Sequence, residues 1–135
     1  MSTPTKPAFT ITGQVTSPEA PNGVQGVAVF AHRYASALLT SSLPGALQAF
    51  TDASGRYSLG LDAGYYTIEV GVFLQTQGYC DFYYLGQPQL PAMTGGGVQT
   101  PKSANVIVSG DLSGFNLILP AGAAKQVGGR WVCNL

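Results

Sequence analysis

Residues 51–70 read TDASGRYSLGLDAGYYTIEV, and this stretch decides the fold class. Two short runs in it alternate apolar and polar residues, which is the period of a half-buried β-strand. A turn precedes each run: residues 52–55 suit a tight hairpin because Gly55 can adopt a positive φ at no steric cost, and residues 62–64 turn the chain again. The sequence therefore predicts two strands, whose apolar faces carry Tyr57, Leu59 and Leu61 in the first and Tyr66, Ile68 and Val70 in the second.

Further strands are expected on both sides of this stretch. The Ala and Leu content of residues 35–47 could support one helical turn, but a Pro-Gly pair and a Thr-Ser-Ser run favour a surface loop there. Residues 86–103 carry three prolines and a triple glycine, which predict a long irregular loop. The expected strands are Phe9–Val15, Val24–Phe30, Cys80–Leu85, Ala104–Val108 and Phe115–Leu119, with a last short edge strand in the tail after Pro120.

About seven or eight short strands in one small chain predict an all-β fold, an antiparallel β-sandwich. The chain has 135 residues, the size of one domain, and its 18 glycines and 9 prolines disfavour long helices. We interpret residues 1–135 as a single domain with its core over residues 8–120. Within it we expect an irregular elaboration over residues 71–103 and a C-terminal tail over residues 121–135.

The charge balance excludes two classes of partner. Six basic and six acidic residues give a formal net charge of zero, and charged residues make up only 9% of the chain. Nucleic-acid binding needs a dense basic face that displaces counterions from phosphate, and a polybasic membrane anchor needs clustered cations. No window approaches the roughly 18 apolar residues of a membrane span, and no secretory signal is visible at the N-terminus. We therefore expect neither nucleic acid nor membrane as a partner.

The two cysteines, Cys80 and Cys133, lie far apart and lack metal-ligand spacing. Three interpretations stay open for them: two separate thiols, a disulfide that ties the C-terminal segment to the sheet, and a reactive thiol. No spacing of possible ligands predicts a metal or a cofactor. Asp52 and Asp62 stand at turns, where a carboxylate commonly accepts backbone N–H groups, rather than in a cluster of calcium ligands.

The order of these segments resembles a known family, the carboxypeptidase regulatory-like domains. The segments that match its opening strands, its hairpin and its last strand are Ile11–Val15, Gly23–Val29, Thr51–Leu59, Gly64–Val70 and Phe115–Leu119. The resemblance covers residues 9–70 well and residues 104–120 loosely. It implies an Ig-like, transthyretin-like (prealbumin-like) antiparallel β-sandwich. Because the matching positions are turns and core residues, the resemblance specifies a fold and not a function.

Enzymes that resemble this sandwich need residues that the chain does not have. Transthyretin-like hydrolases of purine breakdown need more than one histidine and a Tyr-Arg-Gly-Ser-type C-terminus, and intradiol dioxygenases hold iron with two Tyr and two His. This chain has only His32, which we expect to be a surface or hydrogen-bonded residue. No nucleophile-elbow motif is present. We therefore expect no catalytic residue and no enzyme.

Collagen-adhesin B-type domains, which also resemble this sandwich, form an internal isopeptide bond between a lysine and an Asn or Asp beside a buried acid. The first expected strand here contains no lysine, because Lys6 precedes it. Glu69 and Asn116 both alternate with residues that point inward. We therefore expect no isopeptide bond.

Aromatic residues between positions 79 and 84 are the most suggestive feature for function. Alternation puts Phe82 and Tyr84 on one face of the expected strand and Tyr83 on the other. Exposed rings there could stack on sugars or anchor a protein partner; otherwise one face fills the core and the loop after it half-covers the other. Trp131 could cover an end of the core or join the same contact. The candidate interaction surface is Tyr79, Phe82, Tyr83, Tyr84 and Trp131.

Two classes of function remain. The favoured one is a non-catalytic structural or interaction module displayed on a larger assembly, most of all a phage virion accessory protein such as a decoration, fibre or adaptor. The missing signal peptide, the low charge and the many Gly, Ser and Thr residues motivate it. Its partners would be proteins, in a homo-oligomer or a larger assembly, on a virion or an extracellular surface. The alternative is a carbohydrate-binding or adhesin module of an exported protein, which requires exposed, coplanar rings over residues 79–84.

Overall fold

The computed structural model describes residues 8–36, 47–74, 78–92 and 99–134, and these residues form an all-β structure without a helix, as predicted. None of the described segments is therefore a helix that could cross a bilayer. The strands are β1 (Phe9–Thr16), β2 (Ala28–Tyr34), β3 (Leu47–Phe50), β4 (Arg56–Leu61), β5 (Gly64–Phe73), β6 (Tyr79–Tyr83), β7 (Val106–Val108), β8 (Leu117–Ile118), β9 (Ala124–Val127) and β10 (Arg130–Cys133).

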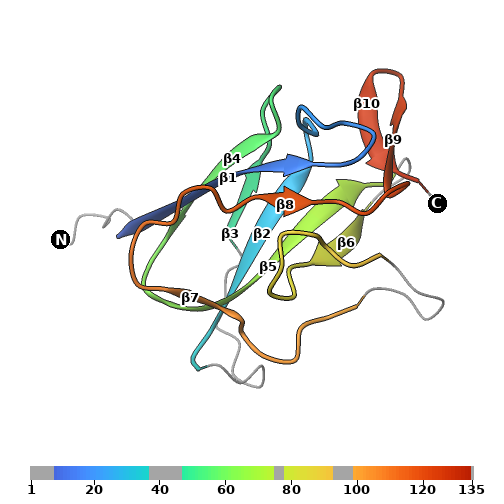
Figure 1. Cartoon of the computed structure of the whole chain (residues 1–135). Helices are drawn as coiled ribbons and strands as arrows, with labels where there is room; N and C mark the ends of the chain where they lie inside the picture. Colours follow the sequence, from blue (N-terminus) through green and yellow to red (C-terminus); the bar gives the residue numbers. More distant parts are fainter. Residues whose placement is uncertain (1–7, 37–46, 75–77, 93–98, 135) are drawn as a thin grey trace.

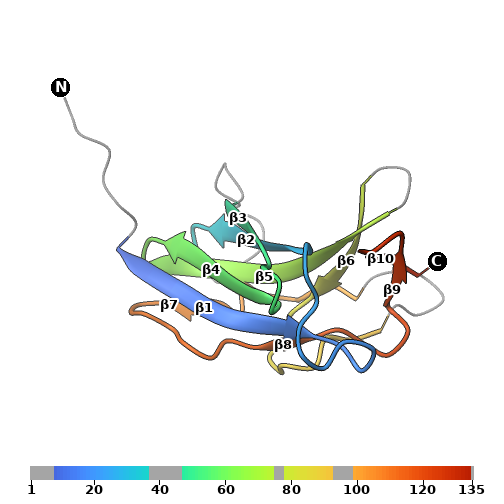
Figure 2. The same ribbon diagram turned by 90° about the horizontal axis from the view of Figure 1, so that it is seen from above.

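Eight of these ten strands form two sheets that pack into a sandwich, and β9 and β10 form a separate two-stranded sheet (Figure 1). The smaller sheet has the order β4-β1-β8, in which β1 is antiparallel to β4 and parallel to β8. The larger sheet has the order β3-β2-β5-β6, and β7 also pairs with β5. Because β2 occupies one edge of β5, β6 and β7 lie end to end along its other edge. Figure 2 shows β1 and β8 on one side of the molecule and β2 and β3 on the other.

Alternation along the strands fills the core between the two sheets, as the sequence predicts. In β4 and β5 every residue expected to point inward is buried, with at most 4% of its surface exposed. Each fully buried side chain of this size stabilises the fold by roughly 1.5–3 kcal/mol. The fully buried side chains that meet between the sheets include Ile11, Val15, Leu61, Tyr66, Ile68, Val70, Leu117 and Leu119.

The turn at residues 52–55 has the expected local structure but does not join two paired strands. Gly55 has φ +73°, and its N–H donates to the carbonyl of Asp52 at 2.9 Å. The strand before the turn, β3, pairs with β2, whereas the strand after it, β4, pairs with β1. The predicted hairpin is therefore wrong: the turn carries the chain from one sheet to the other. Alternation indicates which residues face inward and contains no information about which strand lies alongside.

The second expected strand begins later than predicted. Val24 and Val27 are fully buried, but they precede β2, which begins at Ala28 and continues to Tyr34. The Val24 N–H donates to the carbonyl of Val15, and the Thr51 hydroxyl donates to the Val24 carbonyl and accepts the Val27 N–H. Val24 and Val27 are therefore apolar because they are buried in a loop that hydrogen bonds hold in place. They do not belong to a sheet.

Several other boundaries also differ from expectation. Of the loop expected over residues 35–47, residues 37–46 lie outside the described part, and Leu47 already belongs to β3. The elaboration expected over residues 71–103 begins inside β5 and contains β6, so its first part belongs to the large sheet. The C-terminal tail forms the two-stranded hairpin β9–β10 rather than one edge strand.

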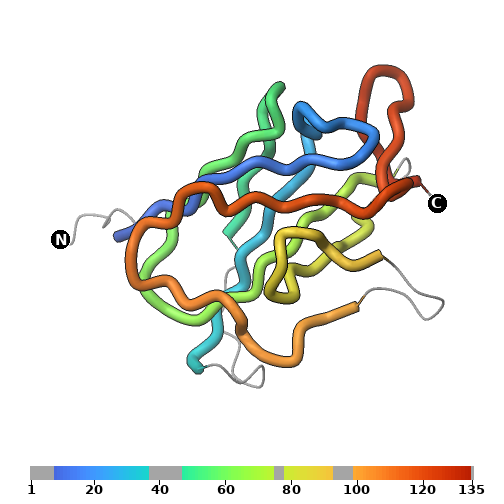
Figure 3. Tube along the Cα trace, viewed as in Figure 1, coloured from blue at the N-terminus to red at the C-terminus, as the bar shows by residue number. Residues whose placement is uncertain are grey.

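The segment after β7 runs alongside β1, as Figure 3 shows. Backbone N–H groups of Thr12 and Leu119 donate to the carbonyls of Leu112 and Thr16, both at 2.8 Å. Only residues 117–118 of the expected strand at 115–119 pair as a strand, β8. The small sheet therefore closes with a largely irregular segment, held by backbone hydrogen bonds to β1.

A disulfide joins Cys80 of β6 to Cys133 of β10, so the structure selects one of the three interpretations left open by the sequence. The two Cα atoms are 6.1 Å apart, and both residues are buried. The hairpin β9–β10 lies at the end of the sandwich opposite the start of β1 (Figure 1). The disulfide therefore fixes this hairpin to the large sheet.

Candidate functional site

The outer face of the large sheet, turned away from the core, carries aromatic rings that contact one another. The rings share this face because their chain neighbours, such as Val29 and Val72, point into the core. Adjacent ring centroids are 4.8–6.1 Å apart, and Phe50 is 51% exposed. We call these four residues the aromatic patch: Phe50 of β3, Phe30 of β2, Phe73 of β5 and Tyr79 of β6.

Gly71 lies beneath two of the rings of the patch. A Cβ atom at this position would be 2.8 Å from the Phe30 ring and 2.9 Å from the Tyr79 ring. The absence of a side chain at Gly71 therefore lets both rings lie close to the sheet, where they meet edge to face at 86°. The patch is a packed surface and not a set of independent rings.

A group of titratable side chains borders the aromatic patch on the same face. Glu69 of β5 lies at its centre and is 6% exposed. Its carboxylate pairs with the His32 imidazole of β2 and lies beside Asp81 and Tyr83 of β6. Register places Glu69 between Phe30 and Tyr83, so this group and the patch are direct neighbours. We call His32, Glu69, Asp81 and Tyr83 the carboxyl cluster.

The environment of the carboxyl cluster shifts the pKa values of its members. Burial and the negative charge of Glu69 raise the pKa of Asp81 to about 6, although His32 acts in the opposite direction. The hydrogen bond with Glu69 raises the pKa of His32 against the effect of burial. Burial raises the pKa of Tyr83 to about 12. Because two adjacent carboxyls cannot both ionise freely, Asp81 takes up a proton near pH 6.

Asp81→Asn is expected to stabilise the protein at neutral pH. The pKa of Asp81 is higher in the folded state than its ordinary value of 3.8, so its ionised form costs stability above about pH 6. Asparagine is neutral throughout, and the gain is about 1 kcal/mol after allowance for solvent screening of this partly exposed group. Urea unfolding at several pH values measures the gain, which should decline as the pH falls below about 6 and vanish below about pH 3, where Asp81 is protonated in both states. A gain that persists at low pH would contradict the electrostatic explanation.

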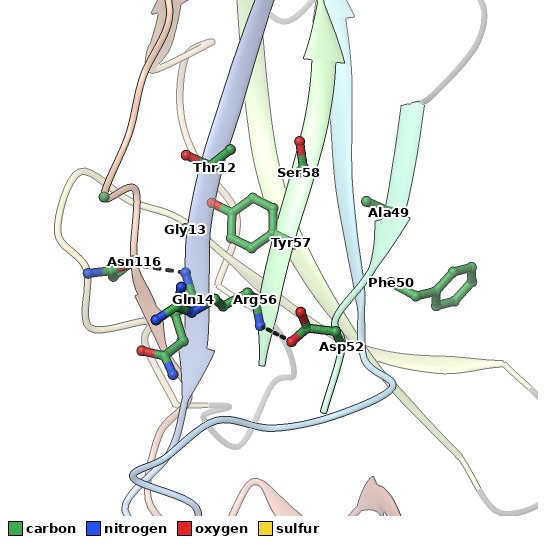
Figure 4. A pocket seen from close by; sticks show the side chains of 11 residues that line it. Thr12, Gly13, Gln14, Ala49, Phe50, Asp52, Arg56, Tyr57, Ser58 and Asn116 are labelled. Atoms are coloured by element: carbon green, nitrogen blue, oxygen red, sulfur yellow. Dashed lines mark hydrogen bonds between the residues drawn. The ribbon is translucent and has the colours of Figure 1, made fainter. Parts of the chain in front are cut away.

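A shallow groove of about 780 Å³ lies on another part of the molecule, over β1, β4 and the end of β3 (Figure 4). Most of its polar groups already have partners within the fold. The Gln14 amide donates to the carbonyls of Asn22 and Ser54, and the Tyr57 hydroxyl donates to the Phe115 carbonyl at 2.5 Å. The Phe50 ring points away from the groove. These contacts hold the fold together, so the groove is a weaker candidate site than the outer face of the large sheet.

The structure divides the candidate residues named from the sequence. Phe82 is in the core with 3% of its surface exposed, and Tyr84 points inward and packs against Phe115, with ring centroids 4.9 Å apart. Tyr79 and Tyr83 do lie on the outer face, one in the aromatic patch and one in the carboxyl cluster. Trp131 is half-buried and lines a cleft of about 300 Å³ together with Phe73, next to the patch.

Phe30, Phe50, Phe73 and Asp81 were not among the candidate residues named from the sequence. Phe30, Phe73 and Asp81 alternate with core residues on their own strands, and Phe50 follows the half-buried Ala49, so each carries the signal of an outward-facing position. Only the strand order β3-β2-β5-β6 shows that these outward-facing positions lie near one another on a single surface.

The remaining acids and amides occupy structural positions. Asp52 accepts the N–H groups of Ser54 and Arg56, and these two bonds lower the pKa of its carboxyl. Asp62 accepts the Ala8 N–H, and Asn116 accepts the Gln14 N–H. In the part of the chain that the structure describes, no group of three or more His, Cys, Asp or Glu is arranged to hold a metal ion.

No family model, curated protein or solved structure matches the chain. The resemblance to carboxypeptidase regulatory-like domains therefore stays a prediction, and the functional argument rests on the residues themselves.

Proposed function

We propose that this chain is a non-catalytic interaction module that binds a protein partner through the outer face of its large sheet. The observation that carries the proposal is the aromatic patch, four rings that contact one another in a continuous row on a sheet face that points away from the core. The outward face of an antiparallel sheet is ordinarily polar. Aromatic side chains gathered on such a face are typical of protein interfaces, where they act as rigid anchors.

The chemistry of the patch favours a protein over a sugar. Its rings meet at 86°, 40° and 8°, so they do not form the flat platform on which a polysaccharide chain stacks. Three of the four rings are phenylalanines, which have no polar atom to bond a sugar hydroxyl. Of the aromatic residues at positions 79–84, only Tyr79 and Tyr83 are on the outer face. Two of the four rings at these positions, Phe82 and Tyr84, are turned inward and are not free to stack on a sugar.

The wider proposal is that the module is displayed on a larger assembly, most of all as a phage virion accessory protein. The low content of charged residues supports it, because contacts made through apolar rings depend little on ionic strength. The location on a virion or an extracellular surface is part of the same proposal.

Selection from a displayed library of random peptides tests the proposed surface. Peptides enriched on the immobilised chain should bind Phe50→Ala and Phe73→Ala at least about tenfold more weakly than the unaltered chain, because truncating an interface hot spot costs about 2 kcal/mol or more. Phe73 does not line the groove over β1 and β4, so its loss separates the two surfaces. Ile107→Ala is the matched control, because Ile107 is 63% exposed but belongs to β7, away from the patch.

Two results would contradict the proposal. One is a set of enriched peptides whose binding is the same for the unaltered chain, Phe50→Ala and Phe73→Ala. The other is binding to a glycan array that Tyr83→Ala abolishes while the fold stays intact, which would establish the carbohydrate-binding alternative. Thermal unfolding of each variant confirms that a loss of binding is not a loss of folding.

A further inference from the structure

We propose that the partner lays an apolar side chain on the aromatic patch and, a few residues away, a lysine or arginine side chain on the carboxyl cluster. The inference rests on the proposed function, because it names the chemistry of the segment that would occupy the same sheet face. Three features of this face carry it: the position of the cluster, its charge, and the effect of docking on that charge.

The position of the carboxyl cluster lets one short segment contact it and the patch together. Glu69 is the cross-strand neighbour of Phe30, and Asp81 is the cross-strand neighbour of Gly71, on which the Phe30 and Tyr79 rings rest. Neighbouring strands in a sheet are about 5 Å apart, so the two surfaces are one or two strand spacings from each other. A partner segment of a few residues spans that distance.

The cluster has one more carboxyl group than it has positive groups. Glu69 is paired with His32, and His32 is also the one cation that acts on the Asp81 carboxyl among the described residues. The other titratable groups around it, Tyr34 of β2 and Tyr83 of β6, bring no positive charge. Neutral pH therefore leaves the Glu69–Asp81 pair short of a cation.

Docking of a partner increases the energetic cost of leaving the Glu69–Asp81 pair without a further cation. A partner that covers the aromatic patch also removes water from the adjacent carboxyl cluster, and a carboxylate that loses water without gaining a partner is strongly destabilised. A guanidinium or ammonium group delivered by the partner satisfies both carboxyls at once. In its absence Asp81 must instead hold a proton when the partner binds. At a pH where Asp81 is already protonated, binding of a basic segment displaces that proton, so the affinity weakens as the pH falls.

The peptides enriched on this chain provide the test. Those whose binding depends on Phe50 and Phe73 should carry a Lys or Arg at a constant spacing from an apolar residue. Their affinity should fall about tenfold for Asp81→Asn, the loss typical of one interfacial charge pair. Asp111→Asn is the matched control, because Asp111 is exposed, contacts β1 of the other sheet, and loses the same charge. This control should bind as the unaltered chain does.

A double-mutant cycle separates a direct contact from a general loss of charge. Replacing the basic residue of an enriched peptide by Gln should weaken binding to the unaltered chain but not further weaken binding to Asp81→Asn. Affinity for the basic peptide should also decrease between about pH 7.5 and pH 5.5, and Asp81→Asn should flatten that dependence. Light scattering of the chain alone should give about 14 kDa, the mass of one copy.

Each contrary result points to a different error. Peptides that depend on Phe50 and Phe73 but show no preference for Lys or Arg would overturn the inference and leave the proposed function standing. Peptides that depend on neither the patch nor the cluster would overturn the proposed function itself. An oligomer of the chain alone that Phe50→Ala dissociates would show that a second copy occupies this face, which also overturns the inference.

Discussion

Loss of the Cys80–Cys133 disulfide is expected to lower the free energy of unfolding by about 4 kcal/mol. The bond closes a loop over a sequence separation of 53 residues, and a cross-link of that span removes much of the freedom of the unfolded chain. It also joins β6 to β10, two strands of different sheets. In the folded state both cysteines are buried, so their loss removes packing as well.

Loss of the disulfide should destabilise the hairpin β9–β10 more than the rest of the protein. Its strands pair only with each other, and most of the side chains of β9 are exposed. Apart from the disulfide, it is held to the sandwich by the buried Ala124 and Val132 and by contacts of β10 with β5. Without the disulfide, amide hydrogens of the hairpin should exchange well before those of β2 and β5.

Urea unfolding measures the effect in the double variant Cys80→Ala/Cys133→Ala, which avoids leaving a free thiol. The reduced unaltered chain should unfold at a similar urea concentration, and a reductant should not affect the double variant. A loss of less than about 1 kcal/mol would contradict the expectation, because it would mean that the unfolded chain is already restricted without the bond.

The strands at the centre of the sequence could be predicted because each carries its own signal. In β4 and β5, alternation places Tyr57, Leu59, Tyr66 and Ile68 in the core regardless of which strand lies alongside. Strand pairing is not local in this sense. The turn at residues 52–55 has the same sequence signature whether it joins two paired strands or crosses between sheets.

The candidate site depends on pairing even more strongly. The rings of the aromatic patch come from four strands and meet only because β2 and β5 lie between β3 and β6. Glu69 shows the same dependence on pairing. Alternation along β5 correctly predicts that Glu69 points away from the core, but neighbours on β2 and β6 bury its side chain. Burial on an outer face comes from cross-strand neighbours, which one strand's sequence does not contain.

Gly55→Ala is expected to cost about 3 kcal/mol or more of stability, and Gly26→Ala about 1 kcal/mol. Both glycines have nearly the same left-handed backbone, with φ +73° and φ +78°, so an L side chain meets the same intrinsic strain of about 1–2 kcal/mol in either. Their surroundings differ. A Cβ at Gly55 would be 2.5 Å from the Val15 carbonyl oxygen and 2.7 Å from the Val24 nitrogen, whereas at Gly26 no atom lies within 4 Å.

The difference between these two variants measures how tightly the crossing between the sheets is packed. The atoms around Gly55 are backbone atoms at the end of β1 and in the loop before β2, and they are joined by the hydrogen bond from the Val24 N–H to the Val15 carbonyl. They cannot move aside as a flexible side chain can, so the added methyl group must displace one of the segments at a cost of roughly 1–3 kcal/mol. Urea unfolding of both variants gives the comparison. Equal losses would mean that strain at φ alone matters, and that the turn joining β3 to β4 is not held against β1 as closely as the structure has it.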